Sequence, residues 1–155
     1  SRISKHNQDL CRKDHREAEV IEIKRRFVEE MIEHSRLENP NECCGILAGV
    51  EGQVTKLYRI KNSTPSPYRY VMDPEEQLGA MRDADEQSLE LMAFYHSHTH
   101  SLAYPSDTDV RMATESGWVD FCYVLVSLEE QSKPDVRFFD ISVDGDITEQ
   151  RAKIT

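Results

Sequence analysis

The chain has 155 residues, 38% of them hydrophobic, which is enough for one globular domain with a buried core. Nineteen basic and 29 acidic residues give a formal net charge of −10, which opposes binding to nucleic acid or to an anionic membrane surface. No apolar run approaches the roughly 18 residues of a membrane span, and no apolar signal segment is evident near residue 1, so we expect a cytoplasmic protein.

The first part of the chain predicts a polar tail followed by the start of a domain. Residues 1–19 hold too few apolar side chains to be buried, so we expect an N-terminal tail there and a single domain over residues 20–155. A short strand is predicted at residues 20–23 because three of these four residues are apolar and β-branched. A helix is predicted at residues 24–37, where apolar residues recur at the spacing of one helical face.

Turn chemistry next separates several short strands. The apolar run at residues 42–50 predicts a strand, and Glu51-Gly52 predicts a hairpin turn into a second strand at residues 53–60. Residues 62–67 are rich in turn formers and predict a loop. A further short strand is expected at residues 68–72.

The segment from Asp73 predicts a helix with a defined start. Asp73 is expected to be its N-cap, Pro74 its first residue, and Glu76 the partner that reaches back to complete a capping box. Leu78 and Met81 are expected to face the core.

The second half of the chain alternates buried strands with one short helix. Residues 91–95 are continuously apolar and predict a central strand buried on both faces, and residues 119–126 predict another buried strand. A short helix is expected at residues 106–116, and strands at 136–143 and 147–150 are joined by an Asp-Gly turn signal. These elements predict a mixed α/β domain with a sheet of six to eight strands and two or three packed helices.

Three histidines follow the predicted central strand. Side chains alternate between the two faces of a strand, so His96 and His98 project to one side and offer half of a tetrahedral zinc site. Asp109 can supply a third ligand if the chain turns back after Pro105, which leaves the fourth position to water. His100 shares the parity of the pair, but we expect it to remain unbound because the loop must turn before Pro105.

Ser106 and Asp109 have a second, purely structural interpretation. A Ser-x-x-Asp pattern after a proline is typical of a helix start, in which Ser106 accepts a hydrogen bond from a free amide and Asp109 favours the positive end of the helix dipole. The two interpretations are compatible. A helix that begins at Ser106 carries Asp109 in its first turn, and it can therefore direct this carboxylate back toward the end of the preceding strand.

Glu42 is the second carboxylate that the sequence singles out. Peptide hydrolysis at a zinc site needs a base that accepts a proton from water and an acid that returns it to the leaving amine, and one glutamate can do both. The alternative is an ordinary surface carboxylate in front of a strand. Cys43 and Cys44 are expected to be small core residues, and the four cysteines together indicate reduced thiols rather than a disulfide framework.

These residues match the signature of a known family. The pattern is a glutamate before Cys-Gly-Ile-Leu, then His-x-His, seven residues, serine, two residues and aspartate, and it resembles that of the JAMM (MPN+) zinc metallopeptidases. The matching positions are Glu42, His96, His98, Ser106 and Asp109. The chain looks closest to the small prokaryotic members, including actinobacterial peptidases that release cysteine from a sulfur-carrier protein. Many relatives have proline where this chain has Thr99, which we interpret as a subgroup feature.

The resemblance implies a fold and an activity. The fold would be a single MPN/JAB-like domain with cytidine-deaminase-like layering. His96, His98 and Asp109 would bind Zn²⁺, Glu42 would act as general acid and base, and Ser106 would orient the substrate and stabilise the oxyanion. The substrate would be an amide or isopeptide bond at the flexible C-terminal tail of a ubiquitin-like or sulfur-carrier protein, including release of cysteine in a cysteine-biosynthesis route.

Two other functions are compatible with parts of this pattern. Relatives with degraded ligands act as non-catalytic MPN-type scaffolds or zinc-binding interaction modules, an alternative that the complete ligand set disfavours. A zinc nucleobase deaminase also pairs a zinc water with a glutamate, but its signature, a His-x-Glu followed downstream by Pro-Cys-x-x-Cys, is missing from the sequence. The sequence leaves the oligomeric state open, with a dimer as one option.

Overall fold

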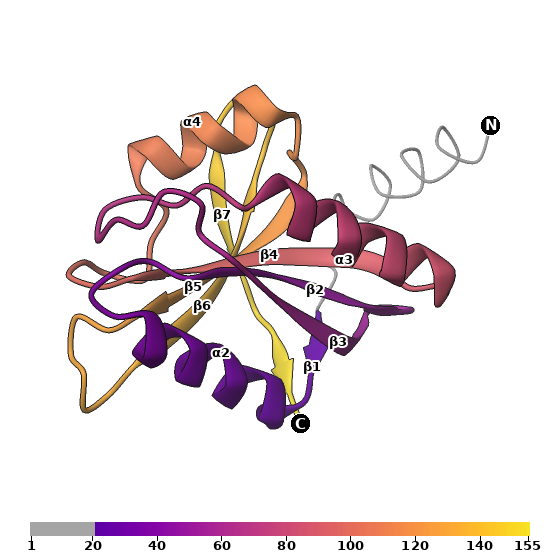
Figure 1. Ribbon diagram of the computed structural model, residues 1–155, viewed down its shortest axis with the longest axis horizontal. Helices are drawn as coiled ribbons and strands as arrows, with labels where there is room; N and C mark the ends of the chain where they lie inside the picture. The colour runs from indigo at the N-terminus through magenta and orange to yellow at the C-terminus, as the bar shows by residue number, and fades with distance from the viewer. Residues whose placement is uncertain (1–20) are drawn as a thin grey trace.

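A mixed eight-stranded sheet runs through the computed structural model, which describes residues 21–155, and three helices of that range pack against it (Figure 1). Most of the predicted elements are present, with ends that differ by a few residues. In chain order the elements are β1 (Glu22–Ile23), α2 (Arg25–Glu38), β2 (Cys44–Val50), β3 (Gln53–Ile60), α3 (Pro74–Glu86), β4 (Glu90–His98), α4 (Asp107–Ser116), β5 (Phe121–Ser127), β6 (Asp135–Ile141), β7 (Ile147–Gln150) and β8 (Lys153–Ile154).

The sheet places β4 in its interior. The strand order is β7-β6-β5-β4-β2-β3-β1-β8, and β4 pairs antiparallel with β2 and parallel with β5. This confirms the central strand that the continuous apolar run predicted. Cys44 lies opposite His96 in the β2–β4 pairing, so the start of β2 lies beside the end of β4.

Hydrophobic clusters of buried residues lie on both faces of the sheet. Helix α2 covers one face, and α3 and α4 cover the other (Figure 1). Alternate residues of β4 contribute to different cores: Ala93 and Tyr95 pack with residues of α2, whereas Phe94 packs with Ala80 of α3 and Ala113 of α4. His96 and His98 have the parity of Phe94, and they therefore project toward the α3 and α4 side.

The strand predicted at residues 68–72 is wrong. Only an isolated antiparallel bridge between Asn62 and Met72 forms there. The amide of Val71 donates to the Asn62 side chain at 3.0 Å, and its carbonyl accepts from the backbone of Ser63 at 2.8 Å. These bonds pair backbone groups of the segment with its own loop rather than with a neighbouring strand of the sheet.

Helix α3 begins as predicted, but its first turn is bonded differently. Asp73 caps the helix by accepting from the amide of Glu76 at 3.0 Å, whereas the Glu76 carboxylate accepts from the amide of Lys61 at 2.8 Å instead of completing a capping box. Leu78 was expected in the core and is 48% exposed, because the face of α3 that contacts the sheet is formed by the small residues Ala80 and Ala84.

The far edge of the sheet contains a pairing that the sequence did not predict. Strand β8 pairs in parallel with β1, with Glu22 opposite Lys153. Strand β8 has only two residues, both exposed, so it has no apolar pattern that would predict a strand. The tail expected at residues 1–19 lies outside the described residues. Within residues 21–155, no helix has both the length and the apolar character needed to cross a membrane.

Candidate metal centre

The end of β4 presents two imidazoles on one face of the sheet. His96 and His98 are 1% and 4% exposed, and between them the buried Ser97 points to the opposite face. There the Ser97 hydroxyl accepts a hydrogen bond from the backbone amide of Cys43 at 2.8 Å, and the Ser97 amide donates to the Cys43 carbonyl at 3.1 Å. These bonds tie the end of β4 to the residues that precede β2.

The first turn of α4 presents a carboxylate to the same place. Ser106 is the N-cap, its hydroxyl accepts from the Asp109 amide at 3.0 Å, and the Asp109 carboxylate accepts from the Ser106 amide at 2.9 Å, which completes a capping box. The box holds the Asp109 side chain in one orientation. The same Oδ2 atom that closes the box also faces the two histidines.

The three side chains converge on one point. Asp109 Oδ2 lies 3.1 Å from His96 Nε2 and 3.0 Å from His98 Nε2, and the two Nε2 atoms lie 3.3 Å apart. A tetrahedral zinc site with bonds of about 2.0–2.1 Å has about 3.3 Å between ligand atoms. The ligand types and their spacing therefore fit a zinc ion. Among the described residues, this is the group of histidine, cysteine and carboxylate side chains that could hold a metal.

A hydrogen bond outside the cluster orients His98. Its Nδ1 atom lies 2.8 Å from the carbonyl oxygen of Leu102, which can only accept, so Nδ1 carries the proton of the neutral ring. Nε2 is then left with its lone pair toward the cluster, as a metal ligand requires. The Leu102 carbonyl belongs to the loop between β4 and α4, so this loop sets both the histidine tautomer and the position of Asp109.

Burial and mutual contact shift the ionisation of the cluster. Burial lowers the pKa of His96, which favours the neutral ring. Burial acts to lower the pKa of His98 as well, but the hydrogen bond and charge of Asp109, the hydrogen bond to the Leu102 carbonyl and the charge of Glu42 together outweigh burial, and the pKa is raised. Burial raises the pKa of Asp109, and the charge and hydrogen bonds of the histidines reverse this, so that its pKa lies well below the usual range and the carboxylate stays ionised.

Glu42 lies two residues before β2 and is 4% exposed. Its Oε1 atom is buried and has no hydrogen-bond partner, and burial raises the pKa of this carboxyl to about 8. The two hydrogen bonds between Cys43 and Ser97 bring the main chain of Glu42 next to the end of β4 that carries His98. A buried, unpartnered carboxylate with a pKa near neutrality can both accept and return a proton.

The structure separates the remaining candidates. His100 is exposed, and its Nδ1 atom contacts the hydroxyl of Thr99 at 2.7 Å, outside the cluster. Cys43 and Cys44 are buried free thiols whose pKa values are raised by burial, in keeping with small core residues. Ser106 is exposed at the start of α4, where its hydroxyl accepts from Asp109 and keeps its own hydrogen free to donate.

Tyr70 is a part of the site that sequence reasoning missed. Its buried ring stacks on the His96 imidazole with 4.5 Å between ring centroids and 29° between planes. The stacking fixes the ring plane of a candidate ligand. The only local signal was an aromatic residue in a segment that the sequence predicted as a short strand, and such a signal does not indicate that the ring stacks on His96.

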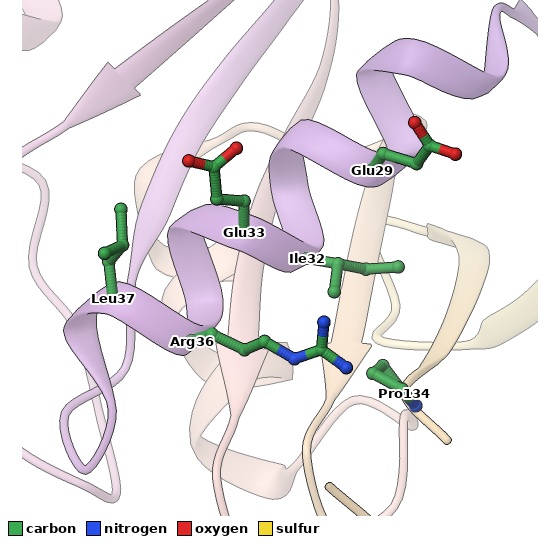
Figure 2. Close-up of a pocket in the computed structure, with 6 residues that line it drawn as sticks. All are labelled: Glu29, Ile32, Glu33, Arg36, Leu37 and Pro134. Atoms are coloured by element: carbon green, nitrogen blue, oxygen red, sulfur yellow. The ribbon is translucent and has the colours of Figure 1, made fainter. Parts of the chain in front are cut away.

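The pocket in Figure 2 lies elsewhere. It has a volume of about 370 Å³ and contains none of the cluster residues. Arg36 extends across it from α2 toward Pro134, and the guanidinium donates to the carbonyl of Gln131 at 3.2 Å. The lining residues are Glu29, Ile32, Glu33, Arg36, Leu37 and Pro134. Since α2 covers the opposite face of the sheet, this pocket is not part of the metal centre.

Comparison with known proteins agrees with this architecture. The family described as prokaryotic homologs of the JAB domain matches residues 24–142. A CysO-cysteine peptidase from Mycobacterium tuberculosis is 41% identical over 140 residues, which cover 87% of this chain and 91% of that protein. A desampylase from Pyrococcus furiosus is 41% identical over 69 residues, or 44% of this chain and 49% of that protein.

A solved structure shows the same arrangement of elements. The solution structure of protein DSY2949 from Desulfitobacterium hafniense superposes with a TM-score of 0.77 at 33% identity, covering 88% of this chain and 93% of that one. The chain therefore belongs to the prokaryotic JAB-domain family of JAMM proteins. It is a JAMM-type hydrolase, as its signature residues predicted.

Proposed function

We propose that the protein is a cytoplasmic zinc peptidase that hydrolyses the amide bond after the C-terminal tail of a ubiquitin-like or sulfur-carrier protein. The observation that carries this proposal is the convergence of His96, His98 and Asp109 beside the buried, unpartnered Glu42. A histidine pair with one carboxylate is a ligand set that leaves a coordination position open. Bound there, zinc would polarise the scissile carbonyl and lower the pKa of a bound water to about 7.

Glu42 supplies the proton transfers in this proposal. Hydrolysis adds a water oxygen to the carbonyl carbon and breaks the C–N bond. The Glu42 carboxylate accepts a proton from the attacking water and returns it to the departing nitrogen, so the products are the carboxylate of the carrier tail and a free amine. A carboxyl whose pKa is about 8 suits both steps near neutral pH.

Ser106 is assigned the oxyanion. Its hydroxyl oxygen accepts the hydrogen bond from the Asp109 amide, so its hydrogen can be donated to the negative charge that develops on the carbonyl oxygen. The capping role does not compete with this role because the two use different atoms of the hydroxyl group.

The similarity to the mycobacterial protein supports a more specific substrate. That relative is named a CysO-cysteine peptidase and aligns with most of this chain. We infer that the leaving group is a cysteine attached through its amino group to the tail of a small sulfur carrier, and that the product enters cysteine biosynthesis. The desampylase supports small-protein conjugates more broadly, but it aligns with less than half of this chain.

Mass spectrometry of candidate adducts tests the proposal. The zinc-loaded protein is incubated with a carrier protein bearing a C-terminal cysteine, with the same carrier joined to a lysine side chain, and with the free carrier as control. We expect a mass loss equal to the cysteine residue in the first sample, abolished by a chelator and restored by zinc. Intact masses in both adduct samples would contradict the proposal and would favour a zinc-binding scaffold.

A further inference from the structure

The backbone of Glu42 is held by a loop rather than by the sheet. Strand β2 begins at Cys44, two residues later. The Glu42 amide donates to the carbonyl of Ser66 at 2.8 Å, and the Glu42 carbonyl accepts from the Asn62 side chain at 3.1 Å. Both partners belong to the 62–72 loop, which consists of residues 62–72 and lies between β3 and α3.

The side chain of Asn62 joins several parts of this loop by hydrogen bonds. Its Nδ2 atom donates to the carbonyls of Glu42 at 3.1 Å and Arg69 at 3.2 Å. Its Oδ1 atom accepts from the amides of Thr64 at 3.1 Å and Val71 at 3.0 Å. A side-chain amide has two donor hydrogens and two acceptor lone pairs. All four are used here, and one of them reaches out of the loop to the candidate base.

The 62–72 loop also contacts the strand that carries the histidines. The Thr99 hydroxyl donates to the Pro67 carbonyl at 3.1 Å, one residue after the end of β4. Tyr70 stacks on the ring of His96 from the same loop. The 62–72 loop therefore connects Glu42 with β4, the strand that carries His96 and His98.

No hydrogen bond holds the Oε1 end of the Glu42 side chain, although this atom is buried. The direction of the carboxylate then follows from the position of the Glu42 main chain. Small displacements of a catalytic group cost rate steeply, on the order of 10²-fold for about 1 Å.

We propose that Asn62 is a positioning residue: its side-chain amide fixes the main chain of Glu42 by donating to the Glu42 carbonyl, and it holds the 62–72 loop against that main chain. The inference rests on the proposed role of Glu42 as general acid and base. It assigns Asn62 no contact with the substrate. The Thr99 hydroxyl adds a second attachment of the loop, which a side chain without a donor could not make.

The test uses Asn62→Asp. The new carboxylate keeps the acceptors for Thr64 and Val71, loses both donors, and turns an acceptor toward the Glu42 carbonyl. We expect kcat to fall on the order of 10- to 100-fold, KM to change by less than about threefold, and bound zinc to stay at the wild-type level. The matched control is Gln53→Glu, which removes an amide that bonds Glu22 at the opposite end of the β2–β3 hairpin, and kcat should not change.

A measurement independent of activity accompanies the kinetics. Hydrogen exchange, followed residue by residue by NMR, should accelerate at the Glu42 amide and across the 62–72 loop in Asn62→Asp, and it should remain at the wild-type rate in the interior of β4. Wild-type exchange at the Glu42 amide in this variant would overturn the inference whatever the rate of hydrolysis. Accelerated exchange with unchanged kcat in an active enzyme would overturn it as well.

The two measurements separate this inference from the proposed function. If the wild-type protein hydrolyses no adduct, the proposed function fails, and the exchange rate at Glu42 alone decides whether Asn62 holds its main chain. If the wild-type protein is active and Asn62→Asp behaves like Gln53→Glu in both measurements, the positioning role fails while the proposed function stands.

Discussion

Helices α3 and α4 begin with the same arrangement of side chains, an acceptor at the N-cap and a carboxylate three residues later. In α3 the carboxylate of Glu76 turns away to accept from the Lys61 amide, and the capping box stays open. In α4 the carboxylate of Asp109 closes the box and faces two histidines. A capping pattern alone therefore does not indicate chemistry. What distinguishes α4 is the strand end that its first turn faces.

The largest difference between the two helix starts is expected in metal binding. Asp109→Asn keeps the size of the side chain and removes its charge, so zinc affinity should fall by more than the roughly 100-fold that loss of an outer-shell partner costs. The matched variant Glu76→Gln should bind zinc like the wild type. Competition with a chromophoric chelator measures both affinities. One equivalent of tightly bound zinc in Asp109→Asn would remove Asp109 from the ligand set.

A second contrast concerns the caps themselves. Ser106→Ala and Asp73→Ala each remove an N-cap acceptor and should each lower the free energy of unfolding by about 1 kcal/mol. Only Ser106→Ala should also slow hydrolysis, by roughly 10²- to 10³-fold, because it removes the proposed oxyanion donor. Denaturant titration and single-turnover kinetics give the two quantities, and zinc content is measured in both variants. Equal rates in the two variants would leave Ser106 as a cap alone.

Metal removal should loosen one helix start and not the other. A ligand at 100 times its dissociation constant stabilises the folded state by about 2.7 kcal/mol. We therefore expect chelation to lower the melting temperature and to accelerate amide exchange in the first turn of α4 and at the end of β4. Exchange in the first turn of α3 should be unaffected. Uniform acceleration in both helices would mean that the metal stabilises the whole fold rather than this corner.

The smallest effect is expected at Glu76. Its carboxylate bonds the Lys61 amide at an exposed position, so Glu76→Ala should cost about 1 kcal/mol or less of unfolding free energy and leave zinc binding and kcat unchanged. Thermal unfolding with and without zinc checks this expectation. A loss of zinc in this variant would show that α3 supports the cluster as well.

Strong local signals predicted most of the fold. The continuous apolar run fixed β4 as an interior strand, and the proline and Ser-x-x-Asp pattern located the start of α4. The features that the sequence did not predict depend on long-range packing. Leu78 has the right chemistry for a core residue, but α3 turns its alanines to the sheet. Strand β8 exists because β1 offers it an edge, which no feature of residues 153–154 reveals.

The candidate site divides in the same way. Strand parity and a helix start are local properties, so the sequence could group His96, His98 and Asp109. The position of Glu42 depends on the pairing of β2 with β4, which is a long-range contact. The sequence pointed to Glu42 only through its resemblance to the family signature. The contacts of Asn62 and Tyr70 arise from a loop whose path no periodicity describes. The roles of all these residues stay predictions until variants are measured.

One measurement tests the central claim most directly: zinc content and turnover of Glu42→Gln, determined on the same sample. Glutamine has nearly the size of glutamate and cannot transfer the proton. The account predicts that zinc stays at one equivalent per chain while kcat for the carrier adduct falls by roughly 10²- to 10⁴-fold. Wild-type turnover in this variant with zinc bound would contradict the assignment of Glu42 as the general acid and base.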